Sequence, residues 1–279
     1  MPVITFSSPK GGAGKTTAAC ILASMLAEQG ATVTIIDADP NQFVQEWAQL
    51  PGLPATLQVV GGATEETIMD KIEEAASMTA FVIVDLEGLA SLMVSHAISM
   101  SDLVVIPVQG SQFDASQAAR QIGLIKRTEK RGGRAIPYTV LITRTNPAIM
   151  PHTLKHILQS FDERAIPVLK TRLCDREAYR AMFSYGGTLQ GLAGKGVANT
   201  TVAINNAAEY AAEIVQRLRD AAVGERADDP GQHDLLGHGE MHFLREREHL
   251  QSPHSVITGM GALADRLRRP LSRTRLVMM

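Results

Sequence analysis

The chain is poor in cysteine and almost neutral overall. Its 279 residues include two cysteines, Cys20 and Cys174, which lie far apart and form no C-x-x-C pair. Isolated cysteines of this kind argue against a disulfide framework and against a zinc site. The formal net charge of −2 argues against a large non-specific grip on nucleic acid, unless a local basic patch provides it.

The sequence also has no long uninterrupted hydrophobic run. No stretch approaches the roughly 20 apolar residues that span a membrane, and the first residues enter an apolar run without the basic region of a signal peptide. We therefore expect no signal peptide, no stable membrane insertion and a cytoplasmic location. With 45% hydrophobic and 20% charged residues, the composition is typical of a globular protein with one good-sized core.

From residue 1 to about residue 220, the chain alternates strand-like and helical segments. This alternation predicts an α/β fold, a mostly parallel twisted sheet flanked by helices on both faces. The strand candidates are continuous and β-branched, as expected of strands buried on both faces: Val3–Ser7, Thr32–Ile36, Leu57–Val60, Phe81–Val84, Leu103–Val108, Tyr138–Thr143 and Pro167–Lys170. The clearest helical patterns cover Thr16–Gln29, Glu65–Ser77, Phe113–Lys130, Pro151–Phe161 and Thr201–Leu218.

The composition changes near residue 221. Residues 224–231 have the composition of a linker, and the segment that follows is rich in His, Arg, Gly and Pro. We expect a folded domain over residues 1–220 and a flexible His/Arg-rich tail over residues 221–279. The histidines of the tail match no metal-ligand spacing.

A glycine-rich stretch carries the strongest chemical signal. Residues 8–17 read Ser-Pro-Lys-Gly-Gly-Ala-Gly-Lys-Thr-Thr and lie between an apolar run and an alanine-rich helical segment. This order is the context of a phosphate-binding loop, in which backbone N–H groups and a helix N-terminus surround an anion. Lys15 would reach the β- and γ-phosphates, and the Thr16 hydroxyl would take a place on Mg²⁺. A turn that binds nothing has no use for both lysines.

The strict motif G-x-x-x-x-G-K-[ST] is not met, because Pro9 occupies the position of its first glycine. A second lysine, Lys10, follows instead. The resulting K-G-G-x-G-K-T-T arrangement resembles the deviant Walker A loop of the ParA/MinD superfamily. The resemblance implies an ATP hydrolase, slow alone and stimulated by a partner, with ATP/ADP and Mg²⁺ as cofactors. The implied nucleotide-binding residues are Gly11, Gly12, Ala13, Gly14, Lys15, Thr16 and Thr17.

The same resemblance implies a homodimer with ATP sandwiched at its interface. Lys10 would then reach across to the phosphates of the partner's ATP, and Lys10 and Lys15 would both be catalytic. A second cation supplied by the partner can neutralise charge that develops during phosphoryl transfer. The sequence leaves open whether the assembly is a dimer or a higher polymer.

Acidic residues follow the second expected strand. Asp37 and Asp39 lie at its carboxyl end, where open α/β sheets bind their ligands. A cap or a turn is the alternative interpretation, since Asp-Pro-Asn is good turn chemistry. The segment resembles the D-x-D-P-Q motif of ParA proteins, with Asn41 where the family usually has Gln. The resemblance implies that Asp39 activates water and that Asp37 is an outer-shell Mg²⁺ group.

Another carboxylate, Asp85, ends a later apolar run in a Walker B pattern and would hold Mg²⁺ through a water. The next residues, Leu86-Glu87-Gly88, depart from the Thr-Pro-Pro of many family members. They resemble the subgroup that contains the ParA-like virulence ATPase of T-DNA transfer and the ParF-type partition proteins. Glu87 is a candidate switch residue, with a solvated loop carboxylate as the alternative.

Two later segments also resemble the family. Residues 103–109 resemble its I-P-V/I-Q segment, which carries interface and switch contacts, although a core strand with a Pro stop explains them equally well. After the strand at residues 138–143, Thr143, Arg144 and Asn146 are candidate contacts to the purine base or to a second subunit. Ordinary turn residues are the alternative there.

Basic residues gather in three clusters, each able to contact DNA phosphates without reading sequence. A solvated helix face is the commoner explanation of a single cluster. The resemblance favours DNA, because ParA dimers hold it non-specifically through their C-terminal half. It also implies a DNA-binding adaptor of the ParB/ParG type and a nucleoid-associated or polar location. The clusters are Lys126, Arg127, Lys130, Arg131 and Arg134; Lys170, Arg172, Arg176 and Arg180; and Arg217 and Arg219.

The function that these features favour is ATP-dependent partition or positioning of DNA. A MinD-like membrane-cycling ATPase is one alternative, although the basic stretch at residues 262–271 is short and broken by Pro270. An iron-protein reductase would need bridging cysteines that this chain does not place. A ParA-like ATPase that recruits a conjugation or T-DNA transfer complex to the cell pole stays open because of Leu86-Glu87-Gly88.

Overall fold

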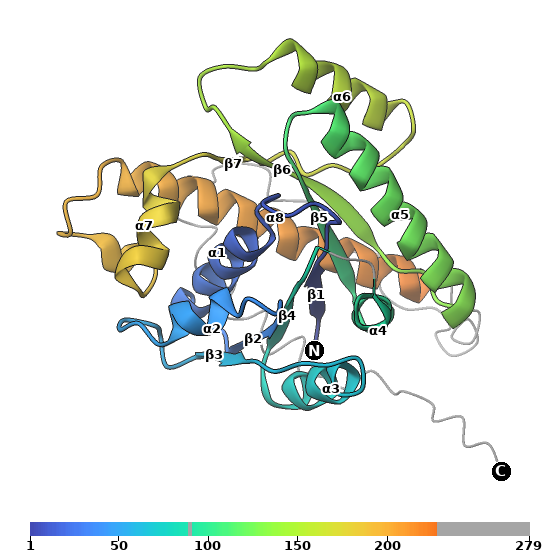
Figure 1. Ribbon diagram of the computed structural model, residues 1–279, viewed down its shortest axis with the longest axis horizontal. Coiled ribbons are helices and arrows are strands. Elements are labelled where there is room, and N and C mark those ends of the chain that lie inside the picture. Colours follow the sequence, from blue (N-terminus) through green and yellow to red (C-terminus); the bar gives the residue numbers. More distant parts are fainter. Residues whose placement is uncertain (89–90, 228–279) are drawn as a thin grey trace, which may run out of the picture.

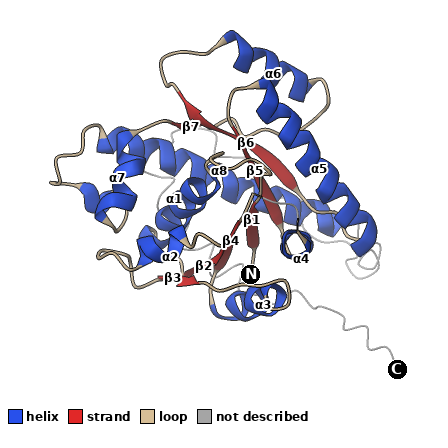
Figure 2. Cartoon of the chain, viewed as in Figure 1, coloured by secondary structure: helices blue, strands red, loops and turns tan. Residues whose placement is uncertain are grey.

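Seven parallel strands form the centre of the computed structural model, which describes residues 1–88 and 91–227. The strand order is β3-β2-β4-β1-β5-β6-β7, so the first strand lies in the middle of the sheet (Figures 1 and 2). The strands are β1 (Val3–Phe6), β2 (Val33–Ala38), β3 (Leu57–Val60), β4 (Phe81–Leu86), β5 (Leu103–Val108), β6 (Tyr138–Thr145) and β7 (Leu173–Cys174). The expected parallel α/β sheet is confirmed.

Helices cover both faces of this sheet and bury two separate cores (Figure 1). One core lies against α1 (Lys15–Glu28), α2 (Phe43–Ala48), α7 (Glu177–Tyr185) and α8 (Thr200–Ala227). The other lies against α3 (Ile68–Met78), α4 (Leu92–Ser99), α5 (Gln112–Gly132) and α6 (His152–Asp162). Because both faces are covered, β1, β2, β4 and β5 are buried along their whole length, which explains their continuous apolar sequences.

Helix α1 is buried on nearly all sides. Its middle residues are small or apolar, and Cys20 among them is a buried free thiol. Helix α8 packs across it, and the Tyr210 hydroxyl donates a hydrogen bond to the Ala18 carbonyl at 3.4 Å. This packing fixes the direction in which the N-terminus of α1 points.

The structure differs from expectation at two places. Residues 167–170 form only an isolated bridge, Val140 to Val168, because Pro167 has no N–H to donate to a ladder; the last strand is β7. Helix α8 continues to Ala227, through residues interpreted as a linker, because its alanines outweigh the cost of about 1 kcal/mol for one glycine. The rest of the expected tail, residues 228–279, lies outside the described residues, and the domain boundary at residue 220 stays a prediction.

Three helices, α2, α4 and α7, are not among the clearest helical patterns of the sequence. Each is short, between 6 and 9 residues, which leaves little room for helical periodicity to show. Over the described ranges, no helix is both long enough and apolar enough to cross a membrane.

Candidate functional site

The glycine-rich loop connects β1 to α1 at the carboxyl edge of the sheet. Parallel pairing brings the acidic residues to the same edge, because Asp85 is in register with Phe6 on one side and with Asp37 on the other. The strand order therefore assembles the loop and the two carboxylates, which are far apart in sequence.

Two glycines give the loop its shape. Gly12 and Gly14 have φ angles of 73° and 94°, in the left-handed region that favours glycine. A Cβ at Gly14 would lie 3.5 Å from Cβ of Thr143. Gly14 is also the N-cap of α1, and no side chain caps that helix. The first N–H groups of α1 are therefore left for an anion rather than for a capping side chain.

Lys15 lies inside the loop and is 7% exposed. Its ammonium is within 3.4 Å of the Ser8 carbonyl oxygen and 3.5 Å of the Lys10 carbonyl oxygen. Burial lowers the pKa of Lys15, and the charges of Asp85, Asp39 and Glu87 act in the opposite direction. Three carboxylates that lie at or just after the ends of two strands thus act electrostatically on one buried cation.

Asp85 is the most deeply buried of these carboxylates, with 0% exposure. Within the described part of the chain, neither of its oxygens has a hydrogen-bond partner. Burial raises the pKa of Asp85 to about 7, with the Thr16 hydroxyl acting in the opposite direction. An unpartnered buried carboxylate is costly and calls for an explanation. A Mg²⁺ ion, which takes oxygen ligands from one or two carboxylates and substrate phosphates, fits Asp85 and Thr16.

Asp37 and Asp39 are held differently. One oxygen of Asp37 accepts hydrogen bonds from the N–H groups of Val44 and Gln45, both at 3.0 Å, and so caps α2. Burial raises the pKa of Asp37, and these hydrogen bonds lower it. One oxygen of Asp39 accepts from the backbone and side-chain nitrogens of Asn41, at 2.9 and 2.8 Å. Asp37 therefore shapes the turn from which Asp39 projects.

Lys10 is held within its own chain. Its ammonium forms an ion pair with Asp114 of α5 at 2.6 Å and lies 3.4 Å from Oε1 of Gln109. The Gln109 amide in turn donates to the Gly12 carbonyl at 2.8 Å. Sequence reasoning missed Asp114; the available signal was its position three residues after Ser111, in a capping box.

The loop after β6 contributes unequally. The Thr143 hydroxyl donates to the Ala13 carbonyl at 2.7 Å and so touches the glycine-rich loop. Arg144 is exposed, with a φ angle of 53°, and the Asn146 side chain accepts from the N–H of Ala148. Of these three residues, only Thr143 contacts the phosphate loop.

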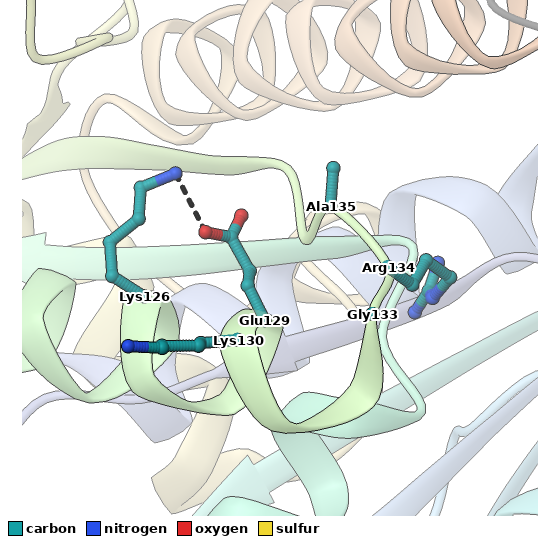
Figure 3. Close-up of a pocket in the computed structure, with 6 residues that line it drawn as sticks. All are labelled: Lys126, Glu129, Lys130, Gly133, Arg134 and Ala135. Carbon is teal, nitrogen blue, oxygen red and sulfur yellow. Dashed lines mark ion pairs between the residues drawn. The ribbon is translucent and has the colours of Figure 1, made fainter.

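The basic clusters differ in how far their residues are engaged by other groups. Three residues of the first cluster, Lys126, Lys130 and Arg134, line a pocket at the C-terminal end of α5, where Lys126 pairs with Glu129 at 2.8 Å (Figure 3). Arg134 there donates to the Ser101 carbonyl. The pocket is lined by Lys126, Glu129, Lys130, Gly133, Arg134 and Ala135.

Several other basic residues are already engaged. Arg180 pairs with Asp175 and Glu177. Arg217 donates to the Val168 carbonyl at 3.1 Å. Arg219, two residues later, is exposed.

These features define a P-loop nucleotide-binding protein of the ParA/MinD type. The family model described as VirC1 protein matches residues 1–222, and the chain belongs to this family. Over 221 residues it is 39% identical to Protein ParA of Rhizobium radiobacter, covering 79% of this chain and 99% of that protein. Over 191 residues it is 28% identical to Protein virC1 of the same organism, covering 67% and 82%.

A solved structure agrees with the fold. The septum site-determining protein MinD complexed with Mg-ADP, from Pyrococcus horikoshii OT3, matches with a TM-score of 0.60 at 13% identity. The match covers 81% of this chain and 99% of that structure. The resemblance of the glycine-rich loop to the ParA/MinD superfamily is therefore confirmed at the level of family and fold.

Proposed function

We propose that this chain is a slow, partner-stimulated ATPase that forms a homodimer with ATP at its interface and partitions or positions DNA. The observation that carries the proposal is the presence of buried Lys15 and buried Asp85 beside one uncapped, glycine-rich helix N-terminus. Similarity to a protein named ParA over 99% of its length supports the partition role.

In this proposal the backbone N–H groups of residues 11–17 hold the phosphates, and Lys15 contacts the β- and γ-phosphates. Thr16 and Asp85 would hold Mg²⁺, which supplies charge neutralisation of the phosphates when bound. We assign Asp37 to the outer coordination shell of Mg²⁺, since one of its oxygens is already engaged in capping α2. Arg144 and Asn146, exposed on the loop after β6, are assigned to the base or the partner subunit.

Asp39 is the proposed water-activating residue. Asn41 holds one of its oxygens, so the other can accept a proton from the attacking water. In the dimer, Lys10 is proposed to give up its contacts with Asp114 and Gln109 and to stabilise charge at the partner's phosphates, as an arginine finger does.

DNA contact is proposed to be non-specific and distributed. Arg127, Lys130 and Arg131 are exposed on α5 and form no ion pair with another described residue. Arg219 joins them as an exposed cation, whereas Arg217 is partly engaged by a carbonyl. A DNA-binding adaptor of the ParB/ParG type would stimulate turnover, and the protein would be cytoplasmic, on the nucleoid or at a pole.

The experiment is a paired measurement on the full chain. ATP turnover and DNA binding are followed with and without Mg²⁺, on DNA of unrelated sequences. The proposal expects slow turnover that DNA and an adaptor accelerate, and equal affinity for each sequence. Absence of turnover and of ATP-dependent DNA binding would refute it.

A second candidate is recruitment of a DNA-transfer complex to the cell pole. The Leu86-Glu87-Gly88 segment favours it, because it resembles the subgroup that contains the ParA-like virulence ATPase of T-DNA transfer, and the 28% identity to Protein virC1 supports this role. Preference for one transfer-origin sequence in the same binding experiment would favour this role. A MinD-like membrane cycle is tested by ATP-dependent co-sedimentation with liposomes.

A further inference from the structure

Asp114 does two things with its two carboxylate oxygens. It is the third residue of α5 and is 3% exposed. One oxygen accepts from the backbone N–H and the hydroxyl of Ser111, at 3.3 and 2.5 Å, and completes a capping box. This oxygen stabilises the start of the helix.

The second oxygen of Asp114 faces Lys10. No hydrogen bond from the described residues reaches it, and the Lys10 ammonium lies 2.6 Å away as its ion-pair partner. A buried carboxylate is destabilising unless a cation compensates it, and removing only the cation is worse than removing both partners. The fold therefore favours Lys10 staying against Asp114.

The segment between β5 and α5 surrounds the rest of the Lys10 head group. Gln109 lies 3.4 Å from the ammonium, and the Phe113 ring centroid lies 6.0 Å from it. We call Gln109, Phe113 and Asp114 the lysine cradle. Because Gln109 also bonds Gly12, the cradle connects the position of Lys10 to the shape of the phosphate loop.

We propose that Asp114 is a positioning residue that holds Lys10 in its own chain and sets the nucleotide requirement for dimerisation. This inference rests on the proposed role of Lys10 at the partner's nucleotide. Asp114 is buried, whereas the Lys10 side chain is 29% exposed, so the lysine can turn away from the carboxylate toward a phosphate of a second subunit while Asp114 stays in place. The attraction between Lys10 and the partner's phosphates must then offset the free-energy cost of leaving Asp114 unpaired. ATP carries more negative charge than ADP, so it attracts Lys10 more strongly and offsets more of this cost.

The test compares wild-type protein with Asp114→Asn by sedimentation velocity, in ATP and in ADP. Asparagine keeps the shape and one oxygen acceptor for Ser111, and loses the charge. We expect the dimer Kd in ATP to fall about tenfold or more, equivalent to ~1.4 kcal/mol, and ADP to support dimers as well. An unchanged or weaker dimer in the variant overturns the proposal.

Two further variants separate this effect from structural damage. Ser111→Ala removes the cap and leaves the carboxylate, so it should lower the Tm without tightening the dimer. In a Lys10→Ala background, Asp114→Asn should have no effect on dimerisation, because the two residues act as one pair. An equal effect in both backgrounds contradicts the proposal.

A measurement without nucleotide distinguishes this proposal from the proposed function. An amine-reactive acetylating reagent should label Lys10 several-fold faster in Asp114→Asn than in wild type, with exposed Lys130 as the internal reference. Equal labelling overturns the hold on Lys10. If wild type does not dimerise with ATP, the proposed function fails, and the labelling ratio alone decides whether Asp114 holds Lys10.

Discussion

The two edges of the sheet carry charge in different ways. At the carboxyl ends of the strands, Lys15 and Asp85 are 7% and 0% exposed, and the charge of Asp85 raises the pKa of Lys15 against the effect of burial. At the pocket near the end of α5, the Lys126 side chain is 57% exposed and pairs with a neighbour one helical turn away. Buried charges need particular partners, whereas exposed ion pairs contribute little. We therefore expect substitutions at the carboxyl ends of the strands to have large effects on ATP binding, turnover or stability, and substitutions at the pocket near the end of α5 to have smaller ones.

The largest effect should come from Lys15→Ala. The variant loses the cation that contacts the phosphates, and we expect ATP affinity to fall by on the order of 100-fold or more. Titration with a fluorescent ATP analogue measures this. Lys126→Ala, at the other edge, should bind ATP like wild type. Similar losses in both variants would break the comparison between the edges.

Asp85→Asn should separate stability from function. Asparagine removes a buried, unpartnered carboxylate charge, so we expect stability without nucleotide to rise by about 1–2 kcal/mol. Turnover with Mg²⁺ should be lost. Thermal unfolding and ATPase assays measure the two effects. The matched change at the other end of the strands, Glu129→Gln, should lower stability by about 1 kcal/mol, because it removes the charge that pairs with Lys126 and accepts from the Ile136 N–H at 2.8 Å. A less stable Asp85→Asn protein would argue against the account.

Lys10→Ala should leave nucleotide binding within a few-fold of wild type and impair dimerisation or turnover. It should also destabilise the nucleotide-free protein, by about 3 kcal/mol at most for a buried pair broken on one side, because Asp114 keeps its charge. Binding, sedimentation and thermal unfolding are measured on one preparation. Normal ATP-dependent dimerisation and turnover would contradict the role of Lys10 at the partner's nucleotide.

The smallest effect should come from the exposed cations. The double variant Lys130→Glu and Arg131→Glu should weaken DNA binding uniformly across sequences and lower the salt slope by about 1–2. Arg180→Ala is the control, because Asp175 and Glu177 already neutralise that arginine. An equal loss in the control would show that net charge alone matters.

Sequence reasoning predicted the elements that can be recognised from the residues of one short segment. The central strands are recognisable because both of their faces are buried, and residues 8–17 are recognisable because phosphate binding needs that order of Gly, Lys and Thr. Asp85 could be placed at the site because carboxyl ends of parallel strands share one edge. The sequence allowed a cap as one interpretation of Asp37 but could not favour it over a ligand-binding role. The helix that Asp37 caps, α2, has only 6 residues and therefore leaves little helical periodicity in the sequence.

Sequence reasoning could not predict contacts that depend on strand order. Lys10 and Asp114 are more than 100 positions apart and meet only because β5 lies beside β1. The pairing of Thr143 with Ala13 likewise needs the position of β6. Engagement of Arg217 by a backbone carbonyl cannot be read from a basic cluster, which is why the predicted DNA patch includes residues already in use.

The account depends most on ATP driving two chains together through the phosphate-loop edge. Sedimentation velocity of the hydrolysis-blocked variant Asp39→Ala tests this directly, because bound ATP then persists. The account predicts twice the protomer mass with ATP and Mg²⁺, and a single protomer with ADP. A single protomer with saturating ATP would contradict it.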